Sequence, residues 1–198
     1  MKCCYTCTEI NHKESIMIKQ LAVASLAVAL LAISSFAAGR GGGSVSSTSE
    51  LTQEQKDTLL FIYQEEKVAR DAYITLGNYY PNQNVYQNIQ SSEQEHMDSA
   101  QGLCEKYGVD ISNVDETDVG VFVVPVLQEL YDTLVAQGYQ SELSGLMVGE
   151  YIEITDIDDL EHAEIGMPSD VVKVYENLKA GSYSHLDAYR SAIDAYNQ

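Results

Sequence analysis

The chain has 198 residues, of which 11 are basic and 30 are acidic, giving a formal net charge of −19. This length predicts one domain once a processed leader is subtracted. Nucleic acid and anionic membranes both require Lys or Arg to neutralise phosphate, so the charge excludes either as a partner.

Residues 1–37 are interpreted as an N-terminal extension and a signal peptide. The apolar run 21–33 has the length of a signal-peptide core and is short for a membrane-spanning helix. Ser35 and Ala37 occupy positions that a signal peptidase reads. Because a polar segment precedes Met17, that residue is a reasonable true start. The protein is expected to be exported, with no membrane attachment after cleavage.

The cysteines give little evidence of redox or disulfide chemistry. Cys3, Cys4 and Cys7 fall in the leader, where a removed segment is favoured over a redox or metal role for the Cys4-x-x-Cys7 spacing. The mature chain keeps Cys104 alone, so it forms no internal disulfide. Removing residues 1–37 takes away three basic and two acidic residues and leaves a formal charge of −20.

Residues 38–51 are predicted to be a Gly/Ser-rich linker and residues 52–198 a helical domain. Thr52-Gln53-Glu54-Gln55 has the form of a capping box, and Pro125 suits the first turn of a helix. The predicted helices run from Thr52 to about Gly77, from about Asn84 to Tyr107, from Pro125 to Gly138, from Ser141 past Ile157, and from Pro168 past Ala192.

The fold class is predicted to be all-α. The segment 119–124 is the one candidate strand, and it has no partner to pair with. The longest connection, residues 108–140, contains a short helix and lies between the second and third long helices. Such a connection allows those two helices to run parallel, as in four-helix bundles with one crossover.

Polar residues interrupt the apolar stripe of each long helix. A single buried Glu or His is more often a hydrogen-bonded structural residue, but their coincidence on four helices favours a metal site. A cation offsets the cost of burying several carboxylates together, and mixed oxygen and imidazole ligands suit iron, manganese or zinc. The candidates are Glu65 or Glu66 on the first helix, Glu93 and His96 on the second, Glu150, Glu153 and Asp156 on the third, and His185 on the last.

Several motifs resemble a known family. The segment 66–73, Glu-Lys-Val-Ala-Arg-Asp-Ala-Tyr, resembles the first-helix motif of rubrerythrin-like ferritin relatives; 93–96 resembles their Glu-x-x-His, and 149–153 their third-helix motif. The order of motifs over residues 52–196 is similar to that of an exported ferritin-like family catalogued as a domain of unknown function (DUF2202-like). Its signatures Glu-Glu-Lys-x-Ala-Arg-Asp, Glu-x-x-His-Met, Ile-Glu-x-x-Asp-Ile-x-Asp-Leu and Gly-Ser-x-x-His-Leu all occur here.

The resemblance implies a ferritin-like four-helix bundle that holds two iron ions, with manganese or zinc as alternatives. It selects Glu66 over Glu65, and it implies that Glu66, Glu93, His96, Glu153 and His185 are ligands. Ser182 stands where the standard di-iron bundle has the Glu of its second Glu-x-x-His pair. Asp156 or Glu150 is expected to replace that carboxylate; otherwise the site is asymmetric or holds one metal.

Three functions remain open. The first is an oxidoreductase that uses peroxide or dioxygen, with Tyr63, Tyr73 or Tyr189 passing electrons. The second is metal sequestration or a structural ion without turnover, and the third is a metal-free acidic interaction module. Metal ions are the expected partners. A homodimer is compatible with this prediction.

Overall fold

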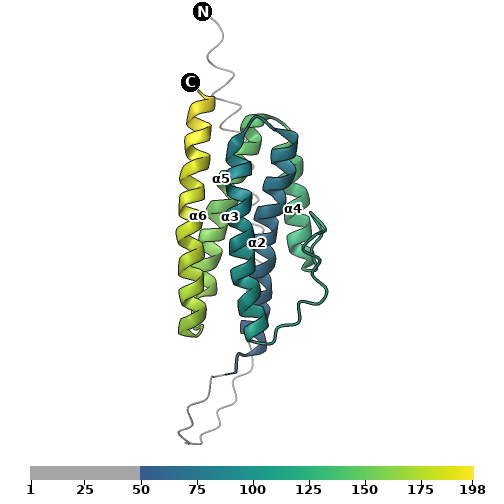
Figure 1. Cartoon of the computed structure of the whole chain (residues 1–198), viewed down its shortest axis with the longest axis vertical. Helices are drawn as coiled ribbons and strands as arrows, with labels where there is room; N and C mark the ends of the chain where they lie inside the picture. Colours follow the sequence, from purple (N-terminus) through teal and green to yellow (C-terminus); the bar gives the residue numbers. More distant parts are fainter. Residues whose placement is uncertain (1–49) are drawn as a thin grey trace, which may run out of the picture. The chain divides into compact units, whose positions relative to one another are not determined.

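The computed structural model describes residues 50–198, so the predicted leader and most of the predicted linker, residues 1–49, lie outside the described part of the chain. This part contains five helices and no strand, and the candidate strand at 119–124 is irregular. The prediction of an all-helical domain is therefore confirmed. The helices are α2 (Gln53–Tyr79), α3 (Asn84–Lys106), α4 (Pro125–Gly138), α5 (Glu142–Ala163) and α6 (Ser169–Tyr196) (Figure 1).

Three helices, α2, α4 and α5, begin at the residues that the sequence predicted for their first turns. Thr52 and Gln55 form a complete capping box, because the Gln55 N–H donates to Thr52 Oγ1 over 3.2 Å and the Thr52 N–H donates to Gln55 Oε1 over 2.9 Å. Ser141 Oγ accepts the Ser144 N–H over 3.0 Å at the start of α5. Pro125 occupies the first turn of α4, where no N–H is needed.

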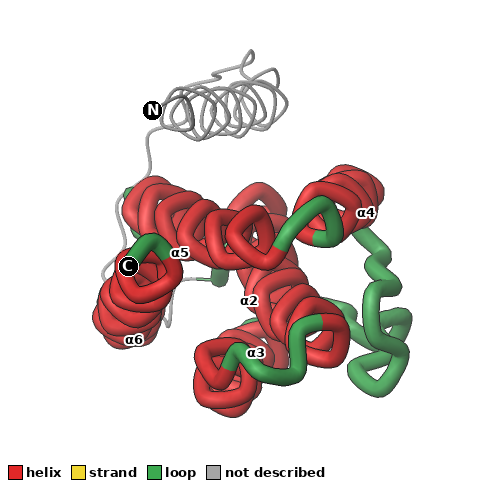
Figure 2. Tube along the Cα trace, turned by 90° about the horizontal axis from the view of Figure 1, so that it is seen from above, coloured by secondary structure: helices red, strands yellow, loops and turns green. Residues whose placement is uncertain are grey.

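The four long helices enclose one interior. Helix α2 packs against α3, α5 packs against α6, and the two pairs meet through α2 with α5 and α3 with α6. Helix α4 lies outside these four, against α2 and α5 (Figure 2). Segment 107–124, called here the connection, runs from the end of α3 along α2 to α4 (Figure 1).

The interior has two apolar ends with polar residues between them. The first end is an aliphatic and aromatic cluster to which all four long helices contribute. At the second end the rings of Tyr73, Tyr86 and Tyr189 pack together, with centroids 5.2 to 6.4 Å apart. The first cluster includes Leu59, Ile62, Tyr63, Met97, Ala100, Leu103, Leu160, Val171, Tyr175 and Leu178.

A buried charged group on α2 fixes the connection. We call Lys67, Arg70 and Asp71 the connection anchor. Lys67 Nζ lies 2.6 Å from Asp71 Oδ2 and donates to the backbone oxygen of Asp118, while Arg70 donates to that of Glu116. The backbone N–H of Gly120, whose φ is 82°, donates to Asp71 over 2.8 Å.

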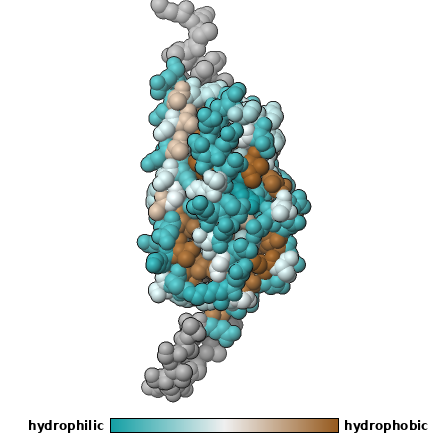
Figure 3. Space-filling view, in the orientation of Figure 1, coloured by the Kyte–Doolittle hydropathy of each residue, from teal (hydrophilic) through white to brown (hydrophobic). Residues whose placement is uncertain are grey.

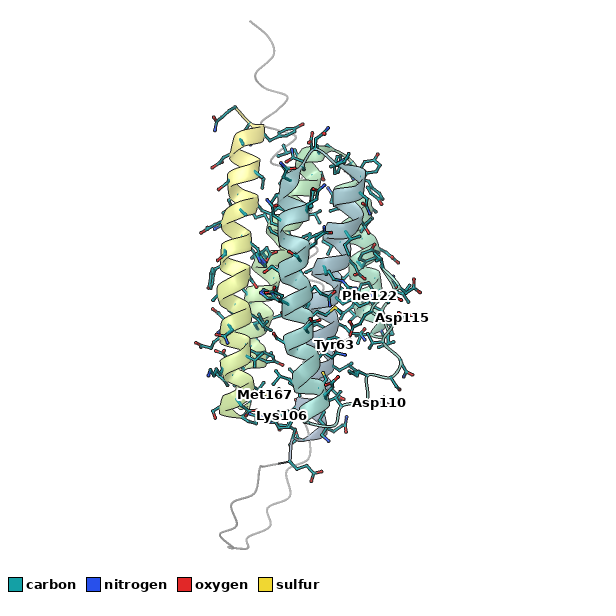
Figure 4. The ribbon with its side chains drawn as sticks, viewed as in Figure 1. Tyr63, Lys106, Asp110, Asp115, Phe122 and Met167 are labelled. Carbon is teal, nitrogen blue, oxygen red and sulfur yellow. The ribbon has the colours of Figure 1, made fainter. Side chains whose placement is uncertain are left out.

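Side chains of α2 also hold the connection along its length. Tyr63 donates to Glu116 Oε1 over 2.6 Å, and Figure 4 places Tyr63 beside the stretch that carries Asp115 and Phe122. Lys67 lies over the Phe122 ring, 4.6 Å from its centroid. The irregular segment is thus attached to α2 by both polar and aromatic contacts.

The surface of the domain agrees with its acidic composition. Figure 3 shows a mostly hydrophilic face on which apolar patches are separated from one another. Within residues 50–198 there is no helix with both the length and the apolar character needed to cross a membrane.

Candidate metal centre

Five of the predicted ligands meet between the two apolar ends of the interior. Helix α2 supplies Glu66, α3 supplies Glu93 and His96, α5 supplies Glu153 and α6 supplies His185, and all five are more than nine-tenths buried. We call these five residues the histidine–carboxylate cluster.

Glu93 lies at the centre of this cluster. His185 Nδ1 is 2.7 Å from Glu93 Oε1, and His96 Nδ1 is 3.3 Å from Glu93 Oε2. His96 Nδ1 is also 3.3 Å from Glu66 Oε2, and His185 Nδ1 is 3.5 Å from Glu153 Oε2. Both imidazoles therefore present Nδ1 to carboxylates from two different helices.

The two imidazole rings are held in place by each other and by residues outside the cluster. They stack with centroids 5.2 Å apart and planes 30° from each other. His185 Nε2 lies 2.9 Å from Ser92 Oγ, which leaves Nδ1 facing inward. Gly181 makes room for His96, since a β-carbon at that position would lie 2.3 Å from His96 Nε2.

Many polar atoms of the cluster have no hydrogen-bond partner. They include both carboxylate oxygens of Glu66, Oε1 of Glu93, and Nδ1 of His96 and of His185, all buried from solvent. The close Nδ1 contacts have ion-pair distances but not the direction of a hydrogen bond. One ligand atom each from Glu93, His96 and His185 lies within 4.8 Å of the others. Buried atoms that make ion pairs but no hydrogen bonds match the donor set of a carboxylate and imidazole metal site.

Burial and charge act against each other in the cluster. Burial raises the pKa of Glu93, but the two histidines lower it to about 2. Burial lowers the pKa of His96 and His185, but neighbouring carboxylates raise them to about 11 and about 9. Burial raises the pKa of Glu66, and it raises that of Glu153 to about 8. Bound protons thus balance these carboxylates, and a cation would replace those protons.

Asp156 lies beside the cluster and is hydrogen-bonded to Ser182 of α6. Ser182 Oγ donates to Asp156 Oδ2 over 2.6 Å, and both side chains are buried. Burial and the charge of Glu66 raise the pKa of Asp156 well above its usual range. A carboxylate from α5 therefore contacts α6 at the residue three positions before His185.

The structure does not bring Glu150 to the cluster. Its side chain is 29% exposed and lies 3.0 Å from the guanidinium Nε of Arg190 at the surface. Each step of three residues falls about 60° short of a full helical turn, so residues 150, 153 and 156 cannot all face inward. Glu153 and Asp156 are the two that do.

Sequence reasoning missed the residues that orient the ligands. Tyr73, considered only as an electron carrier, donates to Glu153 Oε1 over 2.6 Å. The sequence could have indicated that Tyr73 lies near the ligands, because it follows Glu66 by seven residues and positions seven apart share a helix face. Ser92 gave no such signal, since its contact with His185 depends on how α3 packs against α6.

The comparisons with known proteins agree with this fold. The crystal structure of the hypothetical protein MJ0754 from Methanococcus jannaschii matches with a TM-score of 0.72 and 38% identity, covering 78% of this chain and 88% of that one. The uncharacterized protein MJ0754 of Methanocaldococcus jannaschii is 41% identical over 147 residues, which is 74% of this chain and 78% of the relative. The model of the Uncharacterized protein domain (DUF2202) matches residues 55–198, and the chain belongs to that family.

Proposed function

We propose that the protein binds metal within a ferritin-like four-helix bundle. The observation that carries the proposal is the set of buried atoms of Glu66, Glu93, His96 and His185 that face one another in ion pairs and have no hydrogen-bond partner. A polar group that is only structural would be hydrogen-bonded, because leaving a buried donor or acceptor unpaired costs about 1–3 kcal/mol.

The ligands of the proposed site come from all four long helices. Glu66, Glu93, His96, Glu153 and His185 would hold the metal, and Asp156 would supply the carboxylate that Ser182 does not. This donor set suits iron, manganese or zinc, and two iron ions are the occupancy we propose. In this arrangement α3 and α5, which are joined by the connection and α4 together, would run parallel.

The surrounding residues would keep the ligands oriented and dry. Tyr73 holds Glu153 through its hydroxyl group, and Ser92 holds the outer nitrogen of His185. Aliphatic and aromatic side chains close both ends of the interior. A bound redox-active metal would supply the ability to activate peroxide or dioxygen, which would make the protein an oxidoreductase.

Metal content of histidine variants tests the proposal. The wild-type protein is expected to purify with iron, manganese or zinc measurable by elemental mass spectrometry, and the double variant His96→Ala/His185→Ala is expected to lose it. His162→Ala is the matched control, because that imidazole is exposed and 3.8 Å from Asp158 on α5. Equal metal in the double variant and the control would contradict the site.

Peroxide consumption then separates turnover from sequestration. Supplied with an excess of ascorbate as the two-electron reductant, iron-loaded protein is expected to reduce many equivalents of hydrogen peroxide to water. The double histidine variant should do so no faster than free iron. Uptake of iron without peroxide consumption would instead support storage or a structural ion.

We also propose that the mature protein is exported, on the basis of the apolar run 21–33 and the small residues that follow it. Amino-terminal sequencing of the protein recovered outside the cytoplasm tests this. A mature end near Ala37 or Ala38 is the expected result, whereas an intact leader on a cytoplasmic protein would contradict it.

A further inference from the structure

A small cavity lies on the side of the interior that faces α4. It is lined by residues of α2, α4 and α5 and has a volume of about 20 Å³. A cavity that holds one water molecule needs about 10–15 Å³, so this one has room for a single water or ion. Most of its lining is apolar, but Glu65 and Asp156 are among the residues that line it.

Glu65 is the unexplained residue of this cavity. It is only 7% exposed, and its Oε2 has no hydrogen-bond partner. Its carboxyl group lies against that of Asp159, one turn beyond Asp156 on α5, and burial raises the pKa of Glu65 well above its usual range. Within residues 50–198 no Lys, Arg or His forms an ion pair with Glu65, Asp156 or Asp159.

Electrostatic interactions link these three carboxyl groups to one another and to Glu66 of the histidine–carboxylate cluster. Asp159 is half-buried, Glu65 is buried beside it, and Asp156 is buried and interacts electrostatically with Glu65 and Glu66. On the opposite side of the cluster, the stacked rings of His96 and His185 and the close approach of Gly181 fill the space between α3 and α6.

We propose that divalent cations enter the buried site through this cavity, passing from Asp159 to Glu65 and then to Asp156. The route offers oxygen ligands alone, which suit hard or borderline cations such as Mn²⁺ and Fe²⁺. At each step a carboxyl group releases its proton, and the carboxylate replaces water lost by the ion. The route rests on the proposed function, because it supplies the metal site described above.

The rate of metal uptake tests the route. Metal-free protein is mixed with Co²⁺ at pH 7, and binding at the histidine–carboxylate cluster is followed through the visible absorption of cobalt with nitrogen and oxygen ligands. Asp159→Asn and Glu65→Gln are each expected to slow uptake by about tenfold while leaving the final number of bound ions unchanged.

Asp158→Asn is the matched control, since it removes the same charge from the neighbouring residue of α5. The side chain of Asp158 is 50% exposed, it contacts His162, and it does not line the cavity. Its uptake rate is expected to stay within about twofold of wild type. If Glu65→Gln does not fold, Asp159→Asn alone tests the route, because the half-buried side chain of Asp159 tolerates substitution better.

The outcomes separate the route from the metal site itself. The route would be overturned, and the metal site left intact, if Asp159→Asn took up Co²⁺ as fast as Asp158→Asn and reached the same final occupancy. Loss of final occupancy in Glu65→Gln or Asp159→Asn would also overturn it, since the residue would then be a permanent ligand. Failure of wild-type protein to bind Co²⁺ would contradict the metal site, and the route with it.

Discussion

Two buried charged groups share helix α2 and differ in how completely they are paired. Adjacent residues contribute to them: Glu66 belongs to the histidine–carboxylate cluster and Lys67 to the connection anchor. In the anchor, Asp71 receives donors from Lys67, Arg70 and Gly120. In the cluster, neither oxygen of Glu66 has a hydrogen-bond partner.

The difference indicates what each group is for. A buried ion pair with all its hydrogen bonds satisfied is stable without a ligand, whereas an incompletely satisfied one gains by binding a cation. The anchor therefore fixes the fold, and the cluster is where a ligand is expected. Four predictions test this contrast, from the largest expected effect to the smallest.

Replacing the buried cation of the anchor should have the largest effect on stability. Lys67→Met leaves Asp71 without one of its counter-ions and removes two hydrogen bonds to the connection. The free energy of unfolding in urea should fall by about 3–5 kcal/mol, with or without metal. Lys106→Met, at an exposed ion pair, is the control and should cost less than about 1 kcal/mol. Equal losses would mean that the anchor is not structural.

Metal should stabilise the protein through the cluster alone. At a metal concentration 100 times the dissociation constant, the free energy of unfolding should rise by about 2.7 kcal/mol in the wild type. The gain should vanish in His96→Ala/His185→Ala and should reverse on adding a chelator. It should persist in Lys67→Met, measured where that variant is still folded. A loss of the gain in Lys67→Met would remove the distinction between the two groups.

Glu153→Gln should separate ligand function from stability. Burial raises the pKa of Glu153 to about 8, so the metal-free wild type carries a proton there at pH 7. Gln keeps the shape and can still accept from Tyr73, so metal-free stability should change by less than about 1 kcal/mol while the metal-induced gain disappears.

The same variant gives a pH test. A carboxyl pKa raised in the folded state stabilises the protein below the unfolded value of 4.5, and this contribution is lost as pH rises through about 8. Metal-free wild type should therefore lose stability over that range more steeply than Glu153→Gln. Parallel urea unfolding curves for the two proteins from pH 5 to 8.5 would contradict this assignment.

An exposed pair should give the smallest effect. Lys106 and Tyr107 lower the pKa of Asp170 to about 2, but the pair is open to solvent. Asp170→Asn should cost less than about 1 kcal/mol at pH 7. Because the pKa is lowered, this contribution is present above about pH 3.8 and is lost as pH falls toward 2. Thermal unfolding at pH 7 and pH 2 measures it, and added salt should weaken it.

The sequence predicted the helices well because their signals are local. The capping box at Thr52, the proline at 125 and the capping Ser141 each depend on residues within one turn. The residue types of the candidate ligands were equally visible, since charged residues interrupt apolar stripes. Periodicity alone could not decide whether Glu65 or Glu66 faces the interior, and both are in fact buried.

The connection anchor could not be predicted in the same way. Lys67 and Arg70 are the residue types that normally face solvent. Their burial depends on backbone oxygens of Glu116, Asp118 and Val121, which lie 46 to 54 residues away in an irregular segment. No period or spacing in the sequence records such contacts.

The approach of Tyr189 to Gly149 links two positions that lie far apart in the chain. A β-carbon on Gly149 would lie 2.2 Å from the ring of Tyr189, which in turn packs on the Tyr73 that holds Glu153. The two sites therefore constrain each other in evolution. A family member with a larger residue at the position of Gly149 is expected to carry a smaller one at that of Tyr189. Relatives that show this paired exchange would have a different packing of side chains beside Glu153.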